Sequence, residues 1–109
     1  MNANILIADD APNQLELMDF NLTNAGFSII KASNGKEALE LIENHSPDLI
    51  ILDWMMPKMS GIDVCRTLRS RSETKQIPII ILSARSEDSD KSLGLDTGAD
   101  DYISKPFSP

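Results

Sequence analysis

Short apolar runs alternate along this chain with longer segments in which apolar residues recur every three or four positions. The runs are rich in β-branched residues and apolar at almost every position, as is typical of strands covered on both faces. They span Asn4–Ala8, Phe27–Lys31, Asp48–Leu52, Ile77–Leu82 and, more weakly, Asp101–Ser104. Because helical crossovers join parallel strands, this alternation predicts an α/β domain with a parallel sheet.

The segments between the runs carry signals for the start and end of helices. Pro12 stands at a first-turn position, and Gly26 ends the pattern of the first helix. Asn34 and Ser60 stand at the N-cap positions of two further helices, each with an acidic residue three positions later. A fourth helix, Ser86–Leu95, has only two large apolar residues and an internal glycine, so we expect it to be the most loosely packed.

The residues at the strand ends predict the order of the strands. Four strands end in residues suited to phosphoryl chemistry, whereas the second ends in the uncharged run from Ala32 to Gly35. The second strand should therefore lie away from the ligand pocket. An order of 2-1-3-4-5 achieves this, and it places strands one and three at the point where such sheets bind ligands. The expected fold is a flavodoxin-like, doubly wound, five-stranded parallel sheet.

Composition narrows the possible functions. The 109 residues suffice for one domain with its own core, residues 1–109. A formal net charge of −7 argues against direct nucleic-acid binding, since phosphate backbones are bound by clustered Lys and Arg. The single cysteine, Cys65, excludes an internal disulfide and should pack as a small apolar residue. Neither a membrane-spanning run nor a signal peptide is evident, so we expect a cytoplasmic protein with no membrane partner.

Acidic residues at the ends of the first and third strands form a candidate metal site. Asp9 and Asp10 follow the first strand and Asp53 follows the third, and the carboxyl ends of parallel strands share one edge of the sheet. Two like charges about 4 Å apart repel by roughly 4 kcal/mol at an effective dielectric of about 20, so a cation is expected among them. Mg²⁺ takes carboxylate, water and phosphate oxygens. Alternatively, Asp10 caps the helix that begins at Pro12.

Three residues at the same edge are suited to act on a phosphoryl group. The Asp53 carboxylate can attack phosphorus and form an aspartyl phosphate, provided that the charge on the transferring oxygens is neutralised. Lys105, after the fifth strand, supplies positive charge, and Ser83, at the end of the fourth, supplies a hydroxyl. The alternatives are that Lys105 is a solvated surface lysine and Ser83 a turn residue.

Four motifs, in order and at matching spacing, make the whole chain resemble the receiver domain of bacterial two-component response regulators. The motifs are Leu6–Asp10, Asp48–Gly61, Ile79–Arg85 and Gly98–Phe107. The resemblance implies that Asp53 is the phosphoacceptor. It also implies that Mg²⁺ is coordinated by Asp10, Asp53 and the Met55 backbone carbonyl, while Asp9 orients a water on the metal.

The resemblance further implies how a signal enters and leaves the domain. A sensor histidine kinase donates the phosphoryl group, and Lys105 contacts it through a cis Lys105–Pro106 bond. Ser83, where many members have threonine, and Tyr102 report phosphorylation to the outer face. A receiver of this kind is a regulatory phosphoacceptor rather than an enzyme acting on other molecules.

Trp54 and the run Asp100–Tyr102 are similar to the winged-helix transcription-factor branch of that family. Members of this branch control transcription through an output domain, and they dimerise through charged residues of the fourth helix and fifth strand. Here the residues that can supply part of such a face are Lys91, Asp96, Asp100 and Asp101. A solvated acidic surface explains the same residues, and a stand-alone receiver that acts by protein–protein contacts is the alternative to a DNA-binding output.

Two other classes of protein share parts of this pattern. A flavin-binding module needs a phosphate-cradling loop after the first strand, but Asp9 and Asp10 repel phosphate and Pro12 lacks an N–H. A phosphohydrolase needs a second carboxylate close after Asp53, and Trp54 and the residue after it offer none. The phosphorylatable switch therefore remains the favoured interpretation.

The end of the sequence, Ser108-Pro109, matches the start of a helix. In the 2-1-3-4-5 order, the second, third and fourth helices cover one face of the sheet and leave the first helix alone on the other. We therefore expect that the chain is truncated before a fifth helix, and that the uncovered sheet face forms an exposed apolar patch.

Overall fold

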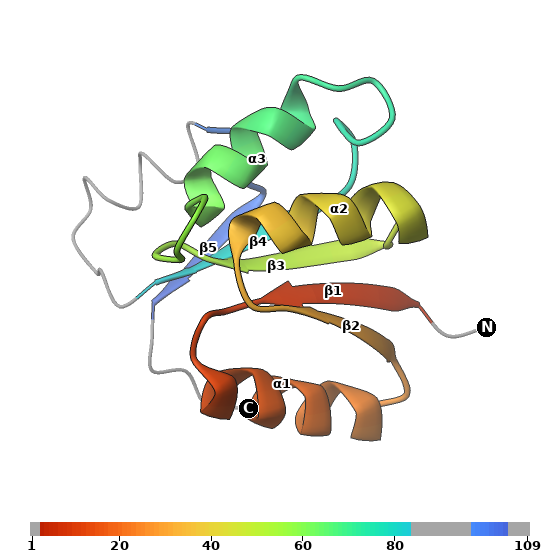
Figure 1. The fold of residues 1–109 in the computed structure, drawn as a ribbon. Coiled ribbons are helices and arrows are strands. Elements are labelled where there is room, and N and C mark those ends of the chain that lie inside the picture. The colour runs from red at the N-terminus through yellow and green to blue at the C-terminus, as the bar shows by residue number, and fades with distance from the viewer. Residues whose placement is uncertain (1–2, 84–96, 105–109) are drawn as a thin grey trace.

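The computed structural model describes residues 3–83 and 97–104, and these form a sheet flanked by helices (Figure 1). The strands are β1 Asn4–Ala8, β2 Ser28–Ala32, β3 Leu49–Asp53, β4 Ile79–Ser83 and β5 Asp101–Ser104. They form one five-stranded sheet in the order β2-β1-β3-β4-β5, and every neighbouring pair is parallel. The predicted fold class and strand order are confirmed.

Strand boundaries differ from the predicted ones by one or two residues. β4 begins at Ile79 rather than at Ile77, because Pro78 has no N–H to donate to the ladder. β3 extends to Asp53, which is its last residue rather than the residue after it. Since Ala8 pairs with Leu52, the next position along both strands places Asp9 and Asp53 side by side.

Three helices are described, and their caps follow the sequence signals. They are α1 Pro12–Asn24, α2 Gly35–His45 and α3 Gly61–Arg69. The Asn34 side chain accepts a hydrogen bond from the Glu37 N–H at 2.8 Å, and the Ser60 hydroxyl accepts one from the Asp63 N–H at 3.1 Å. These bonds satisfy N–H groups that lack a partner within the helix, which fixes where α2 and α3 begin.

The helices cover the two faces of the sheet unequally, with α1 on one face and α2 and α3 on the other (Figure 1). Successive residues of β1 point to opposite faces: Ile5 and Ile7 pack with Met18 of α1, whereas Leu6 and Ala8 join the core under α2 and α3. Among the described residues, 17 buried apolar residues form the core on the α2–α3 face and only four form the core on the α1 face. Most of the apolar burial among the described residues therefore lies on the α2–α3 face.

An apolar groove of about 310 Å³ lies beside α1 on the less covered face. Four residues of α1 and four residues of the strands line it. The α1 residues are Leu17, Met18, Asn21 and Leu22, and the strand residues are Ile51, Ile80, Leu82 and Ile103. The predicted fourth helix, Ser86–Leu95, and the helix start at Ser108 both lie outside the described residues, so the expected truncation stays a prediction. None of the described helices is long and apolar enough to cross a bilayer.

Candidate functional site

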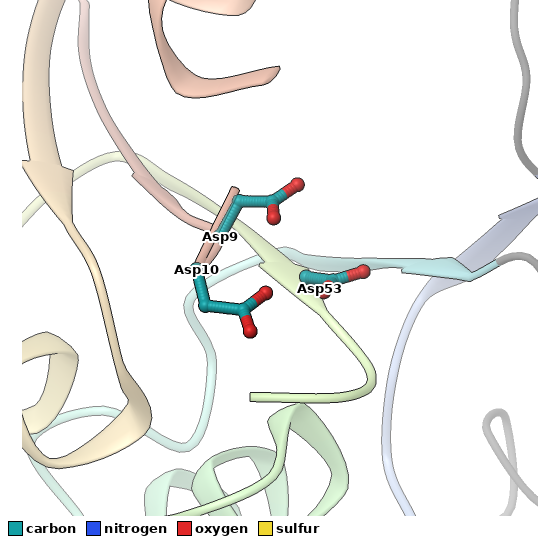
Figure 2. A group of neighbouring side chains, drawn as sticks. All are labelled: Asp9, Asp10 and Asp53. Atoms are coloured by element: carbon teal, nitrogen blue, oxygen red, sulfur yellow. The ribbon is translucent and has the colours of Figure 1, made fainter. Parts of the chain in front are cut away.

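Three carboxylates meet at the edge of the sheet where β1 and β3 end (Figure 2). One oxygen from each of Asp9, Asp10 and Asp53 lies within 4.8 Å of the corresponding oxygens of the other two. Asp9 and Asp53 are buried, with exposed fractions of 0% and 7%, whereas Asp10 is exposed. The structure thus brings together the three carboxylates that the sequence places at one edge, and it opens the cluster to solvent on the Asp10 side.

Backbone hydrogen bonds hold the turn that carries the first two carboxylates. The Asp9 N–H donates to the Ala32 carbonyl at 3.1 Å, and the Asp9 Oδ1 accepts from the Ala11 N–H at 2.9 Å. Ala11 is the N-cap of α1, and no side chain caps this helix. The alternative that Asp10 caps α1 is therefore wrong, because the turn places its carboxylate in the acidic cluster instead.

The chemistry of this donor set fits a hard divalent cation. Ionised carboxylates within 4.8 Å of one another repel by at least about 3.5 kcal/mol at an effective dielectric of about 20, and the cluster contains three such pairs. Oxygen-only ligands suit Mg²⁺ rather than metals that prefer thiolate or imidazole. A Mg²⁺ ion would offset the repulsion, and Asp10 leaves the site open to water and to a phosphoryl oxygen.

A close backbone approach joins α3 to the strand that carries Asp53. A Cβ added at Gly61 would lie 2.3 Å from the Asp53 carbonyl oxygen, which is far inside normal contact. The Gly61 N–H also donates to the Trp54 carbonyl at 2.9 Å. Position 61 therefore requires glycine, because any side chain would clash with the Asp53 carbonyl. The glycine lets the start of α3 pack directly against the backbone of the site.

Ser83 and Tyr102 lie on the two strands beyond β3. Ser83 is the last residue of β4 and is 1% exposed, while Tyr102 of β5 is 4% exposed. The Tyr102 ring packs edge-to-face against the Trp54 ring, with centroids 5.9 Å apart and planes at 86°. Because Trp54 directly follows Asp53, this contact links the acidic cluster to β5.

The Trp54–Tyr102 contact is not evident from the sequence, which suggests Trp54 only as a marker of one family branch. The two rings belong to segments separated by β4, and no local spacing brings them together. The Met55 side chain is exposed, and coordination of a metal by the Met55 backbone carbonyl stays a prediction. Lys105 and the Lys105–Pro106 bond lie outside the described residues, as do Lys91 and Asp96 of the predicted dimer face.

Comparison with known proteins matches residues 5–109 to the response regulator receiver domain. The chain is 49% identical over its full length to the alkaline phosphatase synthesis transcriptional regulatory protein PhoP of Bacillus subtilis, covering 45% of that protein. It is 43% identical, again over its full length, to the DNA-binding response regulator MtrA of Mycolicibacterium smegmatis, covering 46% of it. The solved receiver domain of the Francisella response regulator 1452 superposes with a TM-score of 0.93 at 39% identity, over 98% of this chain and 87% of that one.

The chain thus spans less than half the length of these two curated relatives. What the relatives' names say of transcription and DNA binding belongs to the longer proteins. The expectation that this domain does not itself bind nucleic acid rests on its net charge of −7 and stays a prediction.

Proposed function

This chain belongs to the response regulator receiver domains, and we propose that it is a switch phosphorylated on Asp53 in a Mg²⁺-dependent reaction. The observation that supports this most directly is the group of three carboxylates within 4.8 Å, two of them buried, at the carboxyl edge of a parallel sheet. The role is regulatory: the chain changes its own state rather than turning over a substrate.

In the proposed reaction, an Asp53 carboxylate oxygen attacks the phosphorus of a phosphohistidine on the kinase. A new O–P bond forms as the P–N bond breaks, and the released imidazole nitrogen takes up a proton. The product is an acyl phosphate on a residue whose backbone is fixed by Gly61. Burial of Asp53 at 7% exposure restricts the approach of the donor to the open side of the cluster.

Asp10, Asp53 and the Met55 carbonyl would hold the metal, and Asp9 would orient a water on it. When bound, Mg²⁺ neutralises the charge that develops on the transferring oxygens. The bond from the Ala11 N–H to Asp9 Oδ1 supports the indirect role of Asp9, because one of its oxygens is already occupied. Lys105 is proposed to contact the phosphoryl group from the opposite side.

The output that we propose is control of transcription through a domain outside this chain. The relatives named as transcriptional or DNA-binding regulators match over the full length of the chain, which is less than half of theirs. Ser83 and Tyr102 would carry the phosphorylation state to the surface of β5 and the predicted fourth helix. That surface is the proposed site of a homodimer, and Asp101, which is exposed on β5, would contribute charge to it.

The test is the intact mass of the protein after exposure to a small phosphodonor such as acetyl phosphate with Mg²⁺. We expect the mass of one added phosphoryl group in the parent protein and none in Asp53→Asn. The matched control is Asp63→Asn, which changes an exposed aspartate on α3 and should gain the group normally. Chelation of Mg²⁺ should abolish the gain in every variant. No gain in the parent, or an equal gain in Asp53→Asn, would overturn the proposal.

A further inference from the structure

Arg69, the last residue of α3, binds four groups at once. Its guanidinium donates to the carbonyls of Gly98 at 2.7 Å, Ile77 at 2.7 Å and Lys75 at 3.0 Å. It also forms an ion pair with the Asp100 carboxylate at 2.9 Å. The Arg69 side chain is only 19% exposed, whereas the Asp100 side chain is 60% exposed, so Arg69 reaches from a largely buried position to the surface. The planar guanidinium can satisfy several acceptors in fixed directions, which an ammonium cannot do.

The groups that Arg69 binds lie in two segments, one just before β4 and one just before β5. Gly98 and Asp100 form the turn that enters β5, and Ile77 lies just before β4. Gly98 has a φ of +107°, a backbone conformation that favours glycine. A Cβ at this position would also lie 2.6 Å from the Arg69 Cγ, so a larger residue would clash with the Arg69 side chain. Arg69 therefore packs directly onto the turn as well as binding it.

Asp100 connects this turn to the first residue of β4. Its N–H donates to the Ile79 carbonyl at 2.8 Å, and its Oδ2 accepts from the Ile79 N–H at 2.8 Å. The same Oδ2 binds Arg69. Asp100 thus pairs with Ile79 one step before the ladder in which Ile80 faces Asp101 and Ile81 faces Tyr102. The carboxylate aligns the two strands before their regular pairing begins.

This alignment matters because β5 is short and, among the described residues, has β4 as its only neighbour in the sheet. A slip of one residue would turn every side chain of the strand to the opposite face. Tyr102 would then leave the α2–α3 core and its contact with Trp54. The contacts that fix the register of β5 therefore also hold the Tyr102 ring against the Trp54 ring.

We infer that Arg69, acting through Asp100 and Gly98, is a positioning residue that fixes the register of β5 and keeps Tyr102 against Trp54. Resting on the proposed function, the inference adds that phosphorylation of Asp53 reaches β5 through this ring contact. It also assigns different roles to the two adjacent, exposed aspartates: Asp100 anchors the turn through Arg69 and Ile79, whereas Asp101 would face a partner.

The experiment compares Arg69→Gln with the parent, using Arg71→Gln as a matched control that loses an ion pair to Glu43 instead. Trp54 is the only tryptophan, so its emission reports the ring contact directly. With acetyl phosphate and Mg²⁺, we expect Arg69→Gln to gain the phosphoryl mass as the parent does, but to show less than half of the parent's emission change. Before phosphorylation, its amides at positions 99–103 should exchange at least tenfold faster. Arg71→Gln should match the parent in both readouts.

Arg69→Lys keeps the positive charge that pairs with Asp100 but cannot bond all three carbonyls at once. It should therefore show an emission change between those of Arg69→Gln and the parent. If Arg69→Gln does not fold, Asp100→Asn, which keeps an oxygen for the Ile79 N–H, should show the same changes to a smaller degree. The inference is overturned if these variants match the parent at equal folded fraction, or if Arg71→Gln loses as much. A parent protein that gains no phosphoryl mass would refute the proposed function, while the exchange rates would still test the register.

Discussion

Replacing Asp10 by Asn removes one of the three charges from the acidic cluster without changing the size of the side chain. Each carboxylate pair, with oxygens within 4.8 Å, costs at least about 3.5 kcal/mol at an effective dielectric of about 20 and at least about 0.9 kcal/mol in water. Asp10 is exposed, so the value for water is the appropriate one for its two pairs. Asp10→Asn should therefore stabilise the metal-free protein by about 1–2 kcal/mol. A domain of this size gains roughly 4 °C in its melting temperature for each kcal/mol.

The same substitution should remove most of the stabilisation by Mg²⁺. In the parent, Mg²⁺ at about ten times its dissociation constant should add roughly 1.4 kcal/mol to the free energy of unfolding. Asp10→Asn should show less than half of this gain, because the amide oxygen carries no net charge. The two effects have opposite signs, so the variant should melt above the parent without Mg²⁺, by a margin that shrinks when Mg²⁺ is added.

Thermal unfolding followed by circular dichroism, with and without Mg²⁺, measures both effects. Glu40→Gln is the matched control, since it removes one exposed negative charge from α2, outside the cluster. The control should respond to Mg²⁺ as the parent does. An identical melting temperature of the parent with and without Mg²⁺ would contradict a metal site in the acidic cluster, and so would an Asp10→Asn variant that responds fully.

Three further predictions concern packing and protonation. Gly61→Ala should lower the free energy of unfolding by about 1–3 kcal/mol in urea titrations, because the added Cβ must displace the Asp53 carbonyl. It should also slow phosphorylation of Asp53. A variant with the parent's stability and the parent's phosphorylation rate would contradict this prediction. Burial raises the pKa of the Cys65 thiol, so a thiol reagent at pH 8 should modify the native protein far more slowly than the urea-unfolded chain, and equal rates would refute the assignment. The Thr23 hydroxyl, and after it the Lys31 ammonium, hold the pKa of Asp19 below its usual value. This contact therefore stabilises the fold above the usual carboxyl pKa and is lost as the pH falls through the depressed one. Thr23→Val should raise the Asp19 midpoint in an NMR titration, and an unchanged midpoint would contradict the contact.

The strand order and the acidic cluster could be predicted from the sequence because both depend on short-range signals. Period and composition identify the strands, and the rule that parallel strands share a carboxyl edge then places Asp9, Asp10 and Asp53 together. Asn34 and Ser60 were predicted as caps for the same reason, since a cap and its partner are three residues apart. The predicted start of β4 at Ile77 is wrong because apolar character continues through Pro78, whereas Pro78 has no N–H to donate to the ladder.

The contacts of Arg69 could not be predicted in this way. Arg69 and Asp100 are 31 residues apart, and only the packing of α3 beside β4 brings them together. Residue type alone suggested that Asp100 belongs to a surface for a charged partner, which stays a prediction, but it gave no sign of the ion pair that Asp100 forms with Arg69 within the chain. The role of Asp10 could not be predicted from the sequence either. An aspartate just before Pro12 matches a helix cap as well as a metal ligand, and only the geometry of the turn decides between the two roles.

The position of β1 between β2 and β3 has a consequence for how the chain is made. β1 can pair with β2 through the local β1–α1–β2 unit, but its other edge pairs with β3, and Ile5 meets Leu49 about 44 residues later. At about 5–20 residues per second, a ribosome releases β3 roughly 2–9 s after β1. During that interval Leu6 and Ile7, which are fully buried in the finished domain, lie on a strand with one open edge. An interior strand of the sheet is thus synthesised before one of its two neighbours, and until β3 emerges its open edge can pair with a chaperone or with another chain.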